Sequence, residues 1–201
     1  MKNKPLLLTI IILIISMSSL AQVTATFNDA RDSTIYKTVQ IETQTWMAEN
    51  LNYNANESWC YKDDTCKCNI YGRLYTWDAA KTACPVGWHL PSNDEWTILI
   101  NNLGGEKIAG GKMKESGTTH WKSPNKGAIN TSGFTALPSG DRHILQTNSL
   151  FLSIGYYNGW WSSTESNSSY AWSLGLSLYS TNVNTGDCAK RDGLSIRCLK
   201  D

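Results

Sequence analysis

The sequence lacks any hydrophobic run long enough to cross a membrane. Its longest apolar stretch, Leu6–Ile15, spans about ten residues, whereas a spanning helix needs ~20. Lys2 and Lys4 precede this stretch, and the small-x-small pattern Ser-Leu-Ala follows it at residues 19–21. These features are typical of a cleavable signal peptide. We therefore expect residues 1–21 to be removed and the chain to be secreted or held at the cell surface.

An excess of charge of either sign is also missing. The chain has 18 Lys and Arg against 17 Asp and Glu, and two of the lysines belong to the expected signal peptide. A net charge near zero gives no electrostatic footprint for nucleic acid or an anionic membrane, so we expect neither as a partner. The remaining length suits one domain with a sizeable core. We expect a flexible leader at residues 22–34 and a single domain over residues 35–201.

Phenylalanine is scarce among the aromatic residues, with three Phe against nine Trp and nine Tyr. Trp and Tyr suit half-wet surfaces as well as cores, so the composition permits a binding face. Two adjacent pairs, Tyr156-Tyr157 and Trp160-Trp161, lie close together. Since neighbouring residues of a strand face opposite ways, one ring of each pair can face outward. We expect Tyr156, Tyr157 and Trp160 to bind a ligand; the alternative is that all of these rings pack the core.

The six cysteines are all found after residue 59. An even number in an exported chain predicts three disulfides, although spacing alone does not choose among the pairings. A metal site built on Cys60, Cys66 and Cys68 is the competing interpretation. The sequence lacks the second Cys-x-x-Cys or the paired histidines that such a site needs, so we expect no metal and no cofactor.

Periodicity predicts an α+β order of elements. Between residues 35 and 46, β-branched or aromatic residues alternate with polar ones, which predicts two short strands. Apolar residues three and four positions apart predict a helix over residues 75–83, and Ser92 with Glu95 forms a capping box that begins a second. After Gly105 the chain is rich in Gly, Ser and Thr. We expect a long half of short strands and loops there, with the last strand free to return beside the first.

Five blocks of sequence carry a resemblance to a known family. They are QTWMAENLNY, YGRLYTWDAAKTACPVGWHLPSNDEW, GFTALPSG, WWSSTE and LSIRCLKD. Together they resemble the Fibrobacter succinogenes major paralogous domain, a family of exported bacterial modules. That family is in turn similar to C-type-lectin-like domains; the matching positions here are Trp77, Ala80, Cys84, Leu90 and Glu95. The resemblance implies two helices packed on short antiparallel strands, with a long, loop-rich, C-terminal half and disulfide bonds.

The resemblance also orders the cysteines. In lectin-like domains the cysteine at the end of the helix bonds the one in the last strand, which implies Cys84–Cys198. Family members commonly keep a pair that flanks the loop before Tyr-Gly-Arg-Leu-Tyr, which implies Cys60–Cys68. Cys66 and Cys188 are then left over, and we expect them to form the third bond.

Catalytic chemistry is disfavoured by the same residues. A disulfide from Cys84 to Cys198 removes the thiol that His89 would activate. Formylglycine-generating enzymes share the broad fold class and use a reactive cysteine pair, for which Cys66 and Cys68 are the candidates, but their extended motifs are missing. Calcium-dependent lectins use Glu-Pro-Asn or Gln-Pro-Asp, and neither tripeptide occurs here.

The prediction for function is therefore a secreted, non-catalytic binding or adhesion module for an extracellular polysaccharide or protein. His120 and His143 have no obvious carboxylate partner in the sequence, so we expect both at the surface. The alternatives are a formylglycine-generating-enzyme-like oxidase and a purely structural component of the cell surface.

Overall fold

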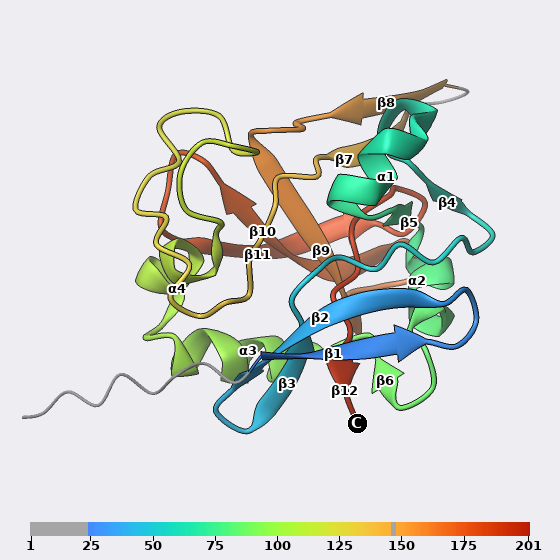
Figure 1. Cartoon of the computed structure of the whole chain (residues 1–201). Helices are drawn as coiled ribbons and strands as arrows, with labels where there is room; N and C mark the ends of the chain where they lie inside the picture. Colours follow the sequence, from blue (N-terminus) through green and yellow to red (C-terminus); the bar gives the residue numbers. More distant parts are fainter. Residues whose placement is uncertain (1–23, 146–147) are drawn as a thin grey trace, which may run out of the picture.

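The structure, a computed structural model, describes residues 24–145 and 148–201 (Figure 1). The expected signal peptide at residues 1–21 lies outside these ranges. Within them the chain forms four α-helices and several antiparallel sheets, which confirms the predicted α+β class. No helix in these two ranges is long and apolar enough to span a bilayer.

A five-stranded sheet joins the beginning and the end of the described chain. In spatial order its strands are β1 (Thr24–Asp29), β2 (Thr34–Ile41), β3 (Gln44–Met47), β12 (Leu199–Lys200) and β6 (Trp88–His89). β2 and β3 form the predicted N-terminal hairpin. β12 lies beside β3, with Leu199 opposite Trp46, so the last strand returns to the N-terminal hairpin, but beside its second strand and not its first.

The prediction of a flexible leader at residues 22–34 is wrong for residues 24–34, the part that the structure describes. β1 pairs with β2 along its whole length. Phe27 packs against Trp88, with 5.1 Å between the ring centroids, and the buried carboxylate of Asp29 binds the guanidinium of Arg31 at 2.6 Å. A polar strand needs few apolar residues of its own where its neighbours supply the packing surface.

A three-stranded sheet and two two-stranded sheets complete the strands (Figure 1). The three-stranded sheet has the order β11 (Val183–Ala189), β10 (Tyr170–Ser177), β9 (Tyr157–Glu165), and the two-stranded sheets are β4 (Ser58–Trp59) with β5 (Leu74–Tyr75) and β7 (Asp141–Leu145) with β8 (Asn148–Leu152). The backbones of Arg142 and Gly193 exchange two hydrogen bonds of 2.9 and 2.7 Å. These bonds fix β7 beside the chain that follows β11.

Local signals explain where the helices begin. The helices are α1 (Thr65–Tyr71), α2 (Trp77–Ala83), α3 (Asn93–Asn102) and α4 (Glu106–Met113), and a 3₁₀ turn spans Tyr61–Asp63. α2 and α3 are the two predicted helices, and α3 begins at the predicted capping box of Ser92 and Glu95. The expectation of two helices was wrong in number, because α1 and α4 form as well, α4 within the half expected to hold only strands and loops. α4 packs directly on the turn between β10 and β11, because a Cβ on Gly110 would lie 2.7 Å from the carbonyl oxygen of Asn182.

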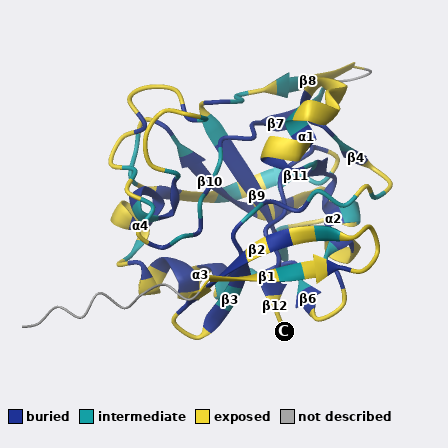
Figure 2. Cartoon of the chain, viewed as in Figure 1, coloured by how far each residue is buried: buried dark blue, intermediate teal, exposed yellow. Residues whose placement is uncertain are grey.

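Two hydrophobic clusters lie on opposite faces of β9. Trp160 belongs to the first cluster, with Trp46 and Trp96, and Trp161 belongs to the second, with Trp77. Figure 2 shows β9 buried over most of its length, whereas β1 and β8 carry many exposed residues. The central stretch of β9 therefore has no side that faces solvent.

A buried arginine connects the last strand to this core. The guanidinium of Arg197 donates to Oδ1 of Asn50 from Nε and Nη2, at 3.1 and 3.0 Å. Its Nη1 donates to the carbonyl oxygens of Met47 and Phe134. Asn50 also accepts from Nε1 of Trp160 at 2.9 Å. Every nitrogen of this enclosed guanidinium therefore has a protein partner.

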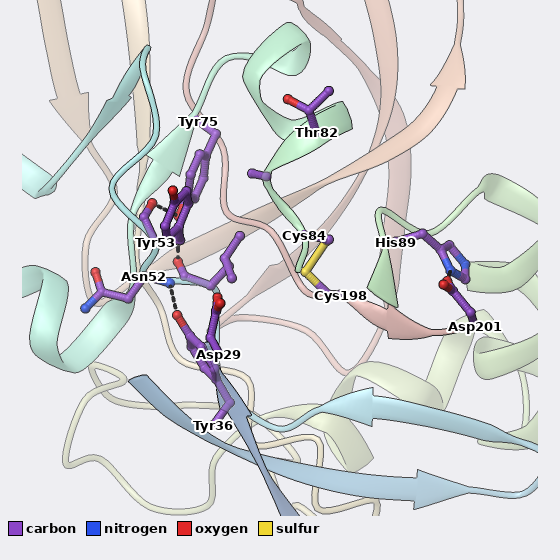
Figure 3. The surroundings of a disulfide bond; sticks show 12 residues. Asp29, Tyr36, Asn52, Tyr53, Tyr75, Thr82, Cys84, His89, Cys198 and Asp201 are labelled. Carbon is purple, nitrogen blue, oxygen red and sulfur yellow. Dashed lines mark hydrogen bonds and ion pairs between the residues drawn. A yellow bond between two sulfur atoms is a disulfide. The ribbon is translucent and has the colours of Figure 1, made fainter. Parts of the chain in front are cut away.

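Two disulfides cross-link the fold, and they are the two pairs that the family resemblance implies. Cys84, after the end of α2, bonds Cys198, immediately before β12 (Figure 3). Cys60 bonds Cys68 in α1. Disulfides persist in oxidising compartments, so both bonds fit an exported protein.

The expected third bond, Cys66–Cys188, does not form. Cys66 is exposed on α1, whereas the thiol of Cys188 is half-buried in β11 and lies 3.7 Å from Oδ2 of Asp192. Burial, and secondly the charge of Asp192, raises the pKa of Cys188 to about 12. The pairing was inferred by elimination, which assumes that every cysteine of an exported chain is bonded.

Candidate functional site

Trp160, one of the three residues expected to bind a ligand, is inaccessible. It is 0 % exposed, and its ring meets that of Phe134 edge-on, with 5.7 Å between centroids. The prediction was wrong because alternation along a strand gives a solvent face only where one side of the sheet is open. Both sides of β9 are covered, so Trp161 is buried as well.

The two tyrosines of the same prediction differ from each other. Tyr157 is half-buried across β10, where a Cβ on Gly175 would overlap its ring. Burial, and secondly the charge of Asp141, raises the pKa of Tyr157 to about 12. Tyr156 is 48 % exposed and is not part of the groove described next. The structure therefore does not bring the three expected residues onto one surface.

A groove of about 800 Å³ opens where five segments meet. These are β4, the start of α2, β7, the turn between β9 and β10, and the end of β11; Figure 1 shows β4 and α2 on the side of the molecule away from α4. The residues that line the groove include the aromatic residues Trp59 and Tyr170 and the hydroxyl residues Thr76, Ser168 and Ser169. A concave surface with a few converging polar groups is a typical ligand site.

Arg142 in β7 is the most enclosed cation of this groove. It is 9 % exposed, yet its guanidinium has no hydrogen-bond or carboxylate partner among the described residues. Nε and Nη1 are fully enclosed, whereas Nη2 is not among the enclosed atoms, and Arg142 lines the groove. The central carbon of the guanidinium lies 3.7 Å from the centroid of the Trp59 ring. Burial lowers the pKa of Arg142, but an arginine stays charged at physiological pH.

The other charged groups of the groove are mostly paired. Lys190 is bound by Glu165, Asp78 by Lys81 at 2.8 Å, and Glu57 accepts from the hydroxyl of Thr76 at 3.0 Å. Arg191 is exposed and, among the described residues, has no carboxylate within salt-bridge distance. The cations left without a partner here are therefore Arg142 and Arg191.

A hydrogen-bonded cluster anchors β7 on both sides of Arg142. Oδ2 of Asp192 lies 2.8 Å from Nδ1 of His143, and Oδ1 accepts from the backbone of Ile144 at 2.9 Å. Asp141 lies 3.5 Å from Nε2 of the same histidine. Burial lowers the pKa of His143, but the hydrogen bond to Asp192 and the charge of Asp141 outweigh it, so the pKa is raised. These contacts fix the backbone of β7 at Arg142.

The expectation that His120 and His143 lie at the surface without partners was wrong. His143 belongs to the cluster just described, and Nδ1 of His120 lies 2.9 Å from both carboxylate oxygens of Glu115. Both rings are half-buried. His89 likewise has a carboxylate partner, since its Nδ1 lies 2.6 Å from Oδ1 of Asp201, a contact that Figure 3 shows beside the last strand. Asp192 and Asp201 are distant in the sequence from the histidines they contact and leave no local pattern, whereas Glu115 is close to His120 in the sequence and was overlooked.

A second cavity, of about 290 Å³, lies between β2, the segment after β3 and α1. Arg197 lines it, but each nitrogen of that guanidinium already donates to the protein. Glu115 lines it too and is paired with His120. This cavity therefore offers a charged ligand less than the groove does.

The cysteine pair considered for oxidase chemistry is not a dithiol in this structure. Cys68 is bonded to Cys60, which leaves Cys66 as a separate exposed thiol. Cys188 is a poor nucleophile, because the thiolate is the reactive form and its pKa is raised. Within residues 24–145 and 148–201, no group of three or more His, Cys, Asp or Glu is arranged to hold a metal.

The groove was not predicted from the sequence, although one local signal lies in it. Between Lys126 and Glu165 the acidic and basic residues are Asp141 and Arg142, side by side. An isolated charged pair in a long uncharged stretch indicates a specific role. What that role is depends on Trp59 and Tyr170, which no spacing rule connects to Arg142.

The fold and the site thus define a disulfide-bonded α+β domain with an open, polar groove. The chain matches the Fibrobacter succinogenes major domain over residues 39–200 and belongs to that family, which confirms the family indicated by the five sequence blocks. No curated protein and no solved structure matches the chain.

Proposed function

We propose that the chain is a secreted, non-catalytic binding module with a C-type-lectin-like fold, which holds an extracellular polysaccharide in the groove. The two disulfides support export. The bond from the end of α2 to the last strand, and the burial of Trp77 and Ala80 on α2, support the lectin-like fold.

The observation that carries this proposal is the combination of rings and hydroxyls in one groove. The C–H face of a sugar packs on an aromatic ring such as that of Tyr170, and its hydroxyl groups hydrogen-bond to polar side chains; one face of Trp59 already holds the guanidinium of Arg142. The turn between β9 and β10 supplies Ser168 and Ser169 at the same place. Protein-binding hot spots are poor in Ser and Thr and centre on well-packed, desolvated anchors, so the mostly polar walls favour a polysaccharide over a protein.

The non-catalytic part of the proposal rests on the two free thiols. A reactive cysteine needs a lowered pKa, whereas burial and Asp192 raise the pKa of Cys188. Cys66 is exposed on the short helix α1, and its former candidate partner, Cys68, is bonded to Cys60.

A glycan array with the wild type and two tyrosine variants tests the proposal. Tyr170 lies in the groove and Tyr156 outside it, yet they expose similar fractions, 43 and 48 %. Tyr170→Ala should weaken glycan binding about tenfold, because one stacking contact is lost, while Tyr156→Ala should bind like the wild type. The reverse result would place the ligand at the tyrosine pair instead of the groove. If the wild type bound no glycan, a protein ligand or a structural role would replace the proposal.

A further inference from the structure

We propose that the polysaccharide is acidic, and that an anionic group on its sugar units, a carboxylate or a sulfate, binds the guanidinium of Arg142. This inference rests on the proposed function and narrows it from sugars in general to charged ones. Three observations support it: one enclosed cation lacks a partner, this cation lies on an aromatic ring, and the nearby carboxylates of Asp141 and Asp192 contact His143 instead.

An enclosed guanidinium without an acceptor destabilises a folded protein. Buried polar groups are normally hydrogen-bonded, and a desolvated charge needs a partner. Arg197 follows this rule with all three of its nitrogens. Arg142 is almost as enclosed, at 9 % exposed, but lacks any acceptor among the described residues. An anionic group that enters the groove would supply an acceptor for Nη2, the one nitrogen of this guanidinium that is not enclosed.

The carboxylates of the protein itself do not fill this role. Asp192 uses one oxygen for His143 and the other for the backbone of Ile144. Asp141 precedes Arg142 directly, and adjacent residues of a strand point to opposite faces. Asp63 contributes a longer-range charge without a hydrogen bond to the guanidinium. The open nitrogen, Nη2, therefore faces the groove and not a protein acceptor.

Stacking prepares Arg142 for an anion. The guanidinium lies over the Trp59 ring at 3.7 Å and is 5.9 Å from the ring of Phe151. The ring holds the guanidinium in place, and Nη2, the nitrogen that is not enclosed, can donate to an oxygen of a carboxylate or sulfate. Arg191, exposed at the same groove, adds a second positive charge, and Tyr170 supplies a ring for the face of the sugar.

Calorimetric titration with matched charged and neutral polymers tests this inference. The probes are polygalacturonate, its fully methyl-esterified form, dextran sulfate and plain dextran. We expect one charged polymer to bind at least about tenfold more tightly than its neutral counterpart, and the identity of that polymer distinguishes a carboxylate from a sulfate. Arg142→Gln should remove most of this difference, whereas Tyr156→Ala should leave it unchanged.

Several results would overturn the inference. Equal affinity for the charged and neutral polymers, or full binding of the charged polymer by Arg142→Gln, contradicts it. If Arg142→Gln does not fold, Arg191→Gln at the exposed position repeats the test, with a smaller expected loss. Tyr170-dependent binding of neutral glycans alone would leave the proposed function standing and reject this inference. Binding of no polymer at all would reject both.

Discussion

The two enclosed arginines of this chain lie in opposite surroundings. Arg197 is fully buried in the core and donates to Asn50, Met47 and Phe134. Arg142 is 9 % exposed at the groove and, among the described residues, donates to none. The hydrogen bonds of Arg197 are satisfied within the protein, whereas Arg142 lacks an acceptor that an anion could supply.

The core residues around Arg197 and the groove residues around Arg142 also differ in whether they lie within the five sequence blocks that indicate the family. Asn50, Phe134, Trp160 and Arg197 all lie within the five blocks, and they contact one another in the core. The ring and cation residues of the groove lie outside the blocks; they are Trp59, Arg142, Tyr170, Lys190 and Arg191. Family membership therefore predicts the core around Arg197 and says little about what the groove binds.

Removal of the disulfide beside Arg197 should have the largest effect on stability. The Cys84–Cys198 bond spans a sequence separation of 114, and the Cys60–Cys68 bond beside Trp59 spans 8. In the chain-entropy model these loops contribute about 5 and about 2.5 kcal/mol. Urea unfolding of the two double Cys→Ser variants should show this order. A larger loss from the variant that lacks Cys60–Cys68 would contradict the view that the core region determines stability.

Replacement of each arginine by methionine tests the comparison itself. Arg197→Met leaves the buried oxygens of Asn50, Met47 and Phe134 without a donor, so the free energy of unfolding should fall by ~3 kcal/mol or more. Arg142→Met removes a desolvated charge and keeps an apolar chain over Trp59, so its stability should change by less than ~1 kcal/mol or rise. Both values come from the same denaturation experiment. Equal losses for the two variants would show that Arg142 is a structural residue like Arg197.

The pH dependence of the contact between His143 and Asp192 should change the free energy of unfolding by a smaller amount. The pKa of His143 is raised in the folded state, so its contribution to stability is fully present below the unfolded value of ~6.5 and is lost as the pH rises through the folded pKa. Asp192→Asn should lower the pKa of His143, measured by NMR titration of the ring. His89, which contacts Glu95 and Asp201 instead, should titrate unchanged. An unaltered pKa of His143 would mean that Asp192 does not hold β7 as described.

The smallest expected effect concerns the two free cysteines. Thiol labelling measures which of them is accessible in the native protein. Iodoacetamide should modify the exposed Cys66 in the native protein, whereas Cys188 should react after unfolding, because its pKa is raised to about 12. Mass spectrometry of the labelled peptides checks both. Rapid native labelling of Cys188 would show that β11 opens at the groove, and a linked Cys66–Cys188 peptide would contradict the structure.

Local patterns predicted much of the fold. The capping box of Ser92 and Glu95 placed α3, and alternation placed β2 and β3, because these signals depend on neighbours in the sequence. β1 was missed because its packing comes from β2 and from Trp88, far along the chain. The surface placement of Trp160 failed for the same reason: nothing in its own strand shows that both faces are covered.

The candidate site was less predictable than the fold. Trp59, Arg142 and Tyr170 come from separate hairpins and turns, and their proximity depends on how β7 is fixed to Gly193. An unpaired cation is also a property of three-dimensional surroundings, which composition and net charge do not report. The sequence could show that Asp141 and Arg142 are isolated charges, but not that Asp141 contacts His143 while Arg142 has no partner among the described residues.

NMR of the arginine side chains tests the central claim most directly. The Nε–H signals of Arg142 and Arg197 can be followed in one sample while polygalacturonate oligomers, or sulfated dextran oligomers in a parallel sample, are added. The account predicts that one of these ligands shifts the Arg142 signal in a saturable way, whereas the Arg197 signal stays in place. A glycan that binds the protein and leaves the Arg142 signal unmoved would contradict the account.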